Sequence, residues 1–321
     1  MIVETQGLVK TYSGKRAVDN LSFTLDPGTV TGFLGPNGSG KSTTLRLMLG
    51  LDHGEGSTTW DGKSLTEYPH ATQVVGAHLD AKFFNPNRTA RNHLRMLGAE
   101  SGISNQRVDE VIDLVGLTEV AKKRPKSFSL GMGQRLGLAG ALLSEPKVLL
   151  LDEPANGLDP QSILWLRDFL KYYASLGNVV FVSSHLLSEM QTMADHLVVI
   201  SRGALIADQS MAQFVARSAQ NDVLIRVADP AKLMAALEDK GFAATSEGDG
   251  GIAVHGVTTD QLGALAFGAG VQVNELRART ASLEQAFMEL TSEGQEYGVG
   301  GGGQPGGQVP GSAAPSDGSA S

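Results

Sequence analysis

The stretch VTGFLGPNGSGKSTTLRLMLG, residues 30–50, decides the fold. It consists of a short apolar run typical of a buried strand, a glycine-rich loop and a helical run that ends near Gly50. The loop fits the pattern G-x-x-x-x-G-K-[ST], and a strand before it and a helix after it are the context in which that pattern binds phosphate. A chance glycine turn is the alternative, and the correct strand, spacing and helix together argue against it.

The residue types of this loop suit phosphate binding. Glycines let backbone N–H groups turn toward phosphate oxygens, and the N-terminus of the following helix adds partial positive charge. We expect Lys41 to reach the β and γ phosphates of a nucleotide and the Ser42 hydroxyl to coordinate Mg²⁺. The expected nucleotide-binding residues of the loop are Gly35, Pro36, Asn37, Gly38, Ser39, Gly40, Lys41, Ser42 and Thr43.

A second motif, KVLLLDEP at residues 147–154, ends an apolar strand with two carboxylates. We expect Asp152 to hold the Mg²⁺ shell and Glu153 to orient or deprotonate an attacking water. An acidic pair after an apolar strand is often no more than a capped strand end. A phosphate loop in the same chain favours the catalytic interpretation.

The order of apolar runs predicts an α/β domain over residues 1 to about 213. Short β-branched or leucine-rich runs alternate with helical stretches, which is typical of a mostly parallel sheet. The region 85–145 differs, because it contains consecutive helical patterns and no convincing strand, so we expect a helical subdomain there. The predicted core strands lie at residues 30–35, 147–154, 178–185 and 196–201.

After residue 213 the pattern changes to a smaller accessory unit, predicted over residues 214–292. Its runs follow the order β-α-β-β-α-β over residues 222–276, which is the split-βαβ, ferredoxin-like pattern, and a last helix is expected at residues 282–290. This unit is either a packing or dimer-stabilising appendage or a regulatory domain for a small ligand. Residues 293–321 are rich in glycine and poor in apolar residues, and a disordered tail is expected there.

Composition excludes several classes of function. The 321 residues carry a net charge of −8, which argues against a general attraction to nucleic acid. The chain has no cysteine, so it has neither disulfides nor thiolate metal sites. The start of the chain lacks the pattern of a signal peptide, and the apolar runs are shorter than the roughly 20 residues that cross a bilayer. Any membrane role is therefore expected to depend on a partner.

With these motifs, residues 1 to about 213 resemble the ATP-binding subunits of ABC transporters. The segment SLGM, residues 129–132, stands where the family has its signature, usually written LSGGQ. Ser129 and Gly131 match in kind, whereas Leu130 and Met132 stand where a glycine and a glutamine are common. The segment NGLD, residues 156–159, resembles the loop that crosses the dimer interface and includes Asp159.

The resemblance implies a cassette with a mostly parallel core sheet, an antiparallel β subdomain and a helical subdomain. His185, at the end of FVSSH, looks like the switch histidine that positions the γ-phosphate and the water. Tyr12 looks like the aromatic that stacks on adenine, although a lone tyrosine is more often simply a packed or surface residue. In the family, each ATP is held between the phosphate loop of one subunit and the signature loop of a second copy, bound head to tail.

One departure from the family concerns its usual glutamine between the core and the helical subdomain. Aligning VVGAHLDAKFF, residues 74–84, places Asp80 there. Asp80 either binds Mg²⁺ or its water, or is a solvated residue that contacts the partner. The following AKFFNP, residues 81–86, is either a local hydrophobic plug or part of the groove that receives a helix of the membrane subunit.

This variation resembles the branch of antibiotic, drug and bacteriocin exporters. The implied function is ATP hydrolysis that powers efflux through a separate transmembrane permease, with ATP and Mg²⁺ as cofactors, at the cytoplasmic face of the membrane. A soluble ABC ATPase acting on ribosomes or nucleic acid is an alternative, but this chain has one cassette and a negative charge. A non-catalytic ATP-binding regulatory or immunity module is another, and Glu153 and His185 argue against it.

Overall fold

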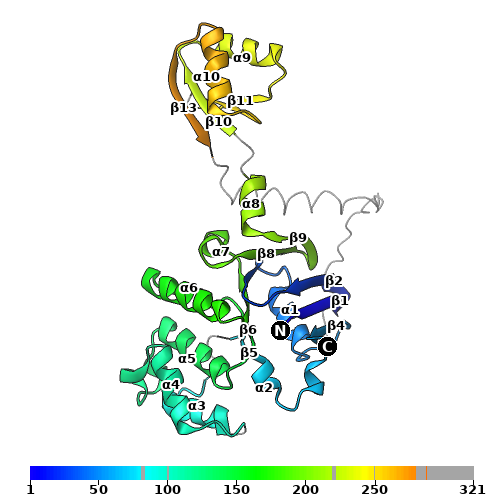
Figure 1. Ribbon diagram of the computed structural model, residues 1–321, viewed down its shortest axis with the longest axis vertical. Coiled ribbons are helices and arrows are strands. Elements are labelled where there is room, and N and C mark those ends of the chain that lie inside the picture. The colour runs from blue at the N-terminus through cyan, green and yellow to red at the C-terminus, as the bar shows by residue number, and fades with distance from the viewer. Residues whose placement is uncertain (81–83, 100, 219–221, 249, 280–286, 288–321) are drawn as a thin grey trace, which may run out of the picture.

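The computed structural model describes residues 1–80, 84–99, 101–218, 222–248, 250–279 and 287, and its described strands form three sheets (Figure 1). The largest sheet has five parallel strands and one antiparallel edge strand, which confirms the predicted, mostly parallel core. In spatial order its strands are β5 (Val75–His78), β6 (Val148–Leu151), β7 (Val179–Ser184), β3 (Val30–Leu34), β8 (His196–Ser201) and β9 (Ala204–Ser210).

Neither edge strand of this sheet was predicted, because β5 has only four residues and the alternation of β9 is weak. Strand β9 pairs with β8 through a two-residue turn in which Arg202 and Gly203 both have positive φ, 51° and 85°. Two such residues match the right-handed twist of the flanking strands. The tight turn therefore produces a hairpin at the end of an otherwise parallel sheet.

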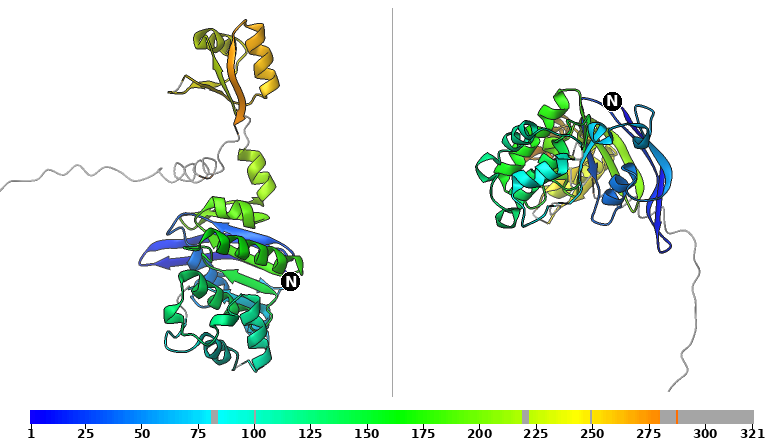
Figure 2. Two further views of the ribbon diagram at one scale, coloured as in Figure 1. Left: turned by 90° about the vertical axis from the view of Figure 1, so that its left-hand side faces the viewer. Right: turned by 90° about the horizontal axis from the view of Figure 1, so that it is seen from below.

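Both faces of the large sheet are buried, which explains its continuous apolar runs. Along β7, Val180 and Val182 face one hydrophobic core, and Val179 and Phe181 face a second core on the other side. Figure 2 shows layers on both sides of the sheet. One side carries helix α1 (Lys41–Met48) and a three-stranded antiparallel sheet of β2 (Lys15–Leu25), β1 (Val3–Tyr12) and β4 (Glu55–Trp60).

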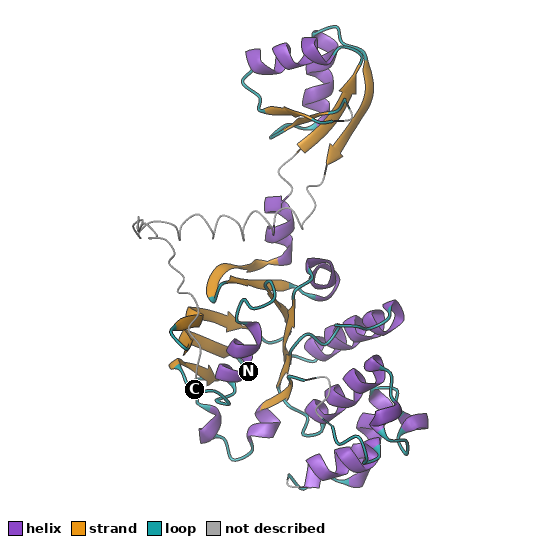
Figure 3. Ribbon diagram, turned by 180° about the vertical axis from the view of Figure 1, so that it is seen from behind, coloured by secondary structure: helices purple, strands orange, loops and turns teal. Residues whose placement is uncertain are grey.

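The opposite side of the sheet is covered by helices (Figure 3). They are α3 (Ala90–Ala99), α4 (Asn105–Leu114), α5 (Leu130–Leu142), α6 (Pro160–Ser175) and α7 (Leu187–Met193), and the short α2 (Ala71–Val74) precedes β5. The described part of region 85–145 contains α3, α4 and α5 and no strand, as the sequence predicts for a helical subdomain. Among the described helices, none is long and apolar enough to cross a membrane.

The C-terminal unit has the predicted β-α-β-β-α-β order and its own hydrophobic core. Its sheet has the strand order β11-β12-β10-β13, with all neighbours antiparallel, as in ferredoxin-like folds. Asp229 and Thr258 cap the two helices by accepting hydrogen bonds from Lys232 N and Gln261 N. The elements are β10 (Asp222–Val227), α9 (Pro230–Asp239), β11 (Ala244–Ser246), β12 (Ile252–Val254), α10 (Thr259–Gly268) and β13 (Val273–Arg279).

Helix α8 (Met211–Ser218) follows β9 and packs against the cassette. Phe214 on this helix is fully buried in the core on the helix-covered side of the large sheet, which is the larger of the two cores. Phe287 packs against the same core. The larger core of the cassette is thus contacted by residues that come before and after the C-terminal unit in the sequence. The disordered tail expected at residues 293–321, and the last predicted helix apart from Phe287, lie outside the described residues.

Candidate functional site

The expected site residues gather at the carboxyl ends of the parallel strands. Because β7 lies between β6 and β3, the residues after these three strands are neighbours: Asp152 and Glu153 after β6, His185 after β7 and the phosphate loop after β3. This edge is where open parallel sheets bind ligands. The structure therefore brings together three motifs that are far apart in the sequence.

The phosphate loop has the shape that its glycines predict. Gly40 has a φ of 109°, and a Cβ there would overlap the Ala17 carbonyl oxygen, so only glycine fits. The exposed turn of Pro36, Asn37 and Gly38 closes with a hydrogen bond from Ser39 N to Pro36 O of 3.1 Å. Ser39 Oγ is buried and has no hydrogen-bond partner within the described residues. A buried hydroxyl of this kind fits a bound phosphate oxygen.

The Lys41 ammonium lies at the centre of the site and is almost completely buried. It donates hydrogen bonds to Gly35 O at 2.7 Å and Pro36 O at 3.3 Å, and it forms an ion pair with Glu153 Oε1 at 3.2 Å. The other oxygen of Glu153 lies 2.6 Å from His185 Nδ1. The Glu153 carboxylate thus bridges a residue of the phosphate loop and the histidine after β7.

The backbone at Glu153 is unusual for a residue with a side chain. Its φ is 48°, in the left-handed region that a side chain disfavours. Such conformations cluster at functional sites, where the surrounding structure enforces them. Here Ser183 Oγ accepts a hydrogen bond from Glu153 N at 2.9 Å, which helps to hold the turn.

Ser183 was not identified from the sequence. Besides accepting from Glu153 N, its hydroxyl donates to Asp152 Oδ1 at 2.5 Å. One hydroxyl therefore orients both acidic residues from the neighbouring strand β7. The only signal in the sequence was the pair of serines before His185 in FVSSH, and a strand interior gave no reason to assign them a role.

The residues predicted to bind Mg²⁺ fit that ion in chemistry. Ser42 is exposed in the first turn of α1, and Asp152 is partly exposed at the end of β6. Among the described residues no group of three or more His, Asp or Glu side chains could hold a metal alone. Mg²⁺ commonly uses one or two carboxylates, waters and phosphate oxygens, which a hydroxyl and one carboxylate beside a phosphate loop can accommodate.

Asp80 is exposed two residues beyond the end of β5, and its role as a metal ligand stays a prediction. The adjoining Ala81–Phe83 part of the expected permease groove lies outside the described residues. Phe84 packs against the larger core as a partly buried side chain. That packing matches the hydrophobic-plug interpretation for this one aromatic.

The signature residues belong to helix α5, which packs on the opposite face of the central sheet from α1. Ser129 is exposed at the N-terminus of α5, where its Oγ accepts a hydrogen bond from Met132 N at 3.2 Å. Gly131 lies in the first turn of α5. Helix α5 packs into the core opposite the one that receives α1 (Figure 1). Each chain therefore presents two separate helix N-termini suited to anions.

Asp159 and Tyr12 have local partners in the structure. Asp159 caps α6 by accepting hydrogen bonds from Ser162 N at 2.9 Å and Ser162 Oγ at 3.0 Å, and the bond from the backbone N–H lowers the pKa of its carboxyl. The Tyr12 ring is exposed, and its hydroxyl donates to Asp52 Oδ2 at 3.0 Å. Nucleotide contacts of both residues stay predictions.

Two family models match the chain. Residues 18–156 match the family described as ABC transporter. Residues 221–284, which include the described C-terminal unit, match a domain of unknown function, DUF8746.

Several curated proteins are similar in sequence. The uncharacterized ABC transporter ATP-binding protein YhcH of Bacillus subtilis (strain 168) is 37% identical over 303 residues, which cover 92% of this chain and 97% of that protein. The bacitracin transport ATP-binding protein BcrA of Bacillus licheniformis is 39% identical over 211 residues, 64% of this chain and 69% of that protein. The linearmycin resistance ATP-binding protein LnrL of Bacillus subtilis (strain 168) is 35% identical over 212 residues, 64% of this chain and 68% of that protein.

Solved structures share the fold of the cassette. An ATP-binding subunit of an ABC transporter matches with a TM-score of 0.61 and 25% identity, covering 68% of this chain and 93% of that one. A dimeric ATP-binding cassette in a post-hydrolysis state, bound to ADP and Pi, matches with a TM-score of 0.58 and 22% identity. The latter covers 65% of this chain and 98% of that one.

Proposed function

This chain belongs to the ABC transporter ATP-binding family and is an ABC ATPase, and from that premise we propose that it powers export of an antibiotic or similar molecule through a separate transmembrane permease. The relatives named for bacitracin transport and linearmycin resistance support this substrate class. The proposed location is the cytoplasmic face of the membrane, where the permease holds the chain as a peripheral subunit.

The observation that carries the catalytic part is the position of Glu153 between Lys41 and His185. In the proposed reaction a water attacks the γ-phosphorus of ATP, and the bond from this phosphorus to the β,γ-bridging oxygen breaks, so that ADP and inorganic phosphate are released. The Glu153 carboxylate orients that water and accepts its proton. His185 orients the carboxylate through the contact of 2.6 Å between Nδ1 and Oε2. Lys41 stabilises the negative charge that develops on the phosphoryl oxygens.

The ion pair between Lys41 and Glu153 suggests how binding prepares this reaction. Nucleotide phosphates carry more negative charge than one carboxylate, so they compete with Glu153 for the Lys41 ammonium. Once Lys41 turns to the phosphates, Glu153 is held by His185 and can accept a hydrogen bond from water. A Mg²⁺ ion held near Ser42 and Asp152 would neutralise phosphate charge.

We further propose that two copies of the chain pack head to tail. One support is that α1 and α5 pack on opposite faces of the sheet. A second is that the described partners of the Lys41 ammonium, namely Gly35, Pro36 and Glu153, belong to the phosphate loop and the end of β6 and not to the signature loop. The signature loop of a second copy would complete each site. In that arrangement Ser129 and the N-terminus of α5 bind the γ-phosphate across the interface.

Capture of membrane partners tests the transport role. We would express the tagged full chain in its native host, solubilise the membranes in detergent, and identify co-purified proteins by mass spectrometry, with the same tag on an unrelated soluble protein as control. We expect one polytopic membrane protein at about equal stoichiometry to the chain. Recovery of ribosomes, or of no membrane protein beyond the control, would contradict the transport role and leave only the ATPase.

A further inference from the structure

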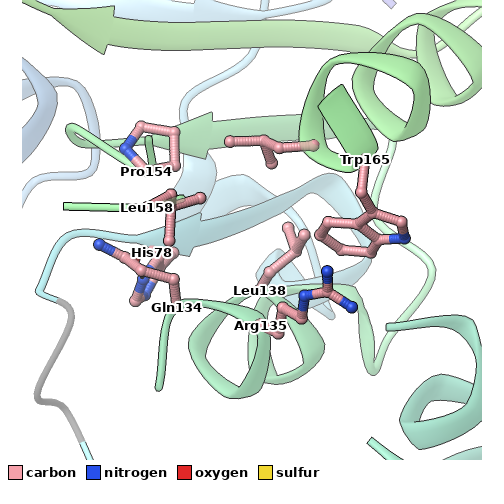
Figure 4. Close-up of a pocket in the computed structure, with 8 residues that line it drawn as sticks. His78, Gln134, Arg135, Leu138, Pro154, Leu158 and Trp165 are labelled. Carbon is pink, nitrogen blue, oxygen red and sulfur yellow. The ribbon is translucent and has the colours of Figure 1, made fainter. Parts of the chain in front are cut away.

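One buried histidine of the cassette has no part in the reaction described above. His78 is the last residue of β5, is 4% exposed, and lines a pocket between β5, α5 and α6 (Figure 4). Its burial lowers the pKa of the imidazole, while the hydrogen bond to Gln134 and the charges of Asp80 and Asp152 oppose that effect. A buried polar ring of this kind needs a specific partner.

That partner is Gln134 on the signature helix α5. The distance from His78 Nε2 to Gln134 Oε1 is 2.7 Å, and Gln134 is itself buried. Because an amide oxygen only accepts hydrogen bonds, the imidazole nitrogen is the donor and Nε2 carries the proton. The bond spans 56 positions of sequence and joins the edge of the central sheet to the helix that starts after Ser129.

The backbone of the same residue contacts the acidic end of β6. Asp152 N donates a hydrogen bond to His78 O at 2.9 Å, which continues the parallel pairing of His78 with Leu151. His78 is therefore connected through its side chain to the signature helix and through its backbone to Asp152. The residue after Asp152 is Glu153.

The surroundings of the ring favour a fixed position. A Cβ at Gly137 on α5 would overlap the imidazole, so the ring packs directly on the helix backbone. The pocket is otherwise lined mainly by apolar side chains, which include Pro154 and Leu158 from the segment that follows Glu153. A hydrogen bond in such a dry environment is strong and directional.

We propose that His78 is a positioning residue that couples the signature helix α5 to the catalytic carboxylates at the end of β6. This inference rests on the head-to-tail dimer of the proposed function. In that dimer Ser129 on α5 belongs to the site of the second copy, whereas Asp152 and Glu153 belong to the chain's own site. The link through His78 and Gln134 thus joins the two ATP sites of one dimer.

The test removes the link without leaving an unpaired polar group. In the double variant His78→Leu/Gln134→Leu both partners become apolar, which suits the pocket, and replacing both members of a hydrogen bond is far milder than removing one. The conservative variant His78→Gln keeps a donor for Gln134. The matched control is His93→Leu in the helical subdomain. Like His78, His93 is 4% exposed, but its Nδ1 has no hydrogen-bond partner within the described residues.

We expect the double variant to keep the circular dichroism spectrum of the wild type and to bind ADP with an affinity within about twofold of wild type. Its kcat for ATP should fall about tenfold or more, because small misplacements of catalytic groups are costly. On a Glu153→Gln background, which slows hydrolysis, the ATP concentration needed for dimerisation should rise. His78→Gln should restore at least part of kcat, and His93→Leu should leave kcat unchanged.

Two outcomes would overturn the inference. One is a folded double variant with wild-type kcat, and the other is an equal loss in the His93→Leu control. If the double variant does not fold, Gly137→Ala decides the question, since it keeps both partners but displaces the ring, and wild-type kcat in that variant would contradict the coupling. A wild-type chain without ATP turnover would instead overturn the proposed function.

Discussion

At the scale of single residues, the acidic end of β6 depends on a hydroxyl from the adjacent strand. Ser183 Oγ donates to Asp152 Oδ1 and accepts from Glu153 N, so it fixes the direction of both residues. Such second partners orient metal ligands, and their loss commonly weakens metal binding about 10- to 100-fold. In the proposed Mg²⁺ site, where Asp152 holds the ion, Ser183 is therefore a sensitive position for the Mg²⁺ dependence of ATP hydrolysis.

We predict that Ser183→Ala raises the Mg²⁺ concentration for half-maximal ATPase activity by about tenfold or more, because Asp152 loses its orienting partner. The measurement is steady-state turnover over a Mg²⁺ titration at saturating ATP. Ser184→Ala is the matched control, because the neighbouring hydroxyl donates to Glu189 instead. Equal Mg²⁺ curves for the two variants would show that Ser183 does not orient the acidic pair.

The sequence predicted which motif residues come together at one edge of the sheet, but it did not predict which other side chains hold them there. Lys41, Asp152, Glu153 and His185 each follow a recognisable buried strand, and parallel strands bring such ends to one edge. Ser183 and His78 could not be identified, because their partners lie 31 and 56 positions away in the chain. Those pairings depend on how distant strands and helices pack together, which local patterns do not encode.

At the scale of elements, the predicted helices and central strands were the most reliable part. Asp229 before Pro230 predicted the start of α9, and the structure has that cap. Strand β9 was missed because a two-residue turn and a partly exposed edge leave little hydrophobic alternation. The three-stranded sheet was predicted through the resemblance alone, because its strands alternate only in part.

A histidine on helix α3 makes the free energy of unfolding depend on pH. His93 on α3 is buried, and burial, followed by the nearby positive charge of Arg88, lowers the pKa of its imidazole. The unfolded state then binds a proton more readily than the folded state. Stability from the neutral ring is fully present above the unfolded pKa of about 6.5 and is lost as the pH falls below it.

We predict that the free energy of unfolding falls between pH 7 and pH 5 and that His93→Leu reduces this fall. The measurement is urea unfolding followed by circular dichroism at several pH values. Some acid sensitivity should remain in the variant, because burial also lowers the pKa of His78. An identical pH dependence in the variant and the wild type would mean that His93 is not buried in its neutral form.

At the scale of the whole molecule, the two proposed half-sites lie at the N-termini of α1 and α5, helices that pack on opposite faces of the central sheet. Helix α1, which begins at Lys41, packs in one core, and helix α5, which follows Ser129, packs in the opposite core. In the proposed dimer, each complete ATP site forms between two copies, because the signature loop of one copy covers the phosphate loop of the other.

Mixing two inactive variants tests this central claim most directly. Lys41→Ala removes the phosphate-loop ammonium, and Ser129→Asp keeps a cap for α5 but places a negative charge against the γ-phosphate. Each variant alone should have little turnover, because both sites of its homodimer carry the same defect. In a mixed dimer one site carries both substitutions and the other carries neither.

We predict that mixing the two variants restores ATPase activity to roughly a quarter of wild type, from random pairing of a symmetric dimer. A mixture no more active than its separate components would contradict ATP sites shared head to tail between two copies.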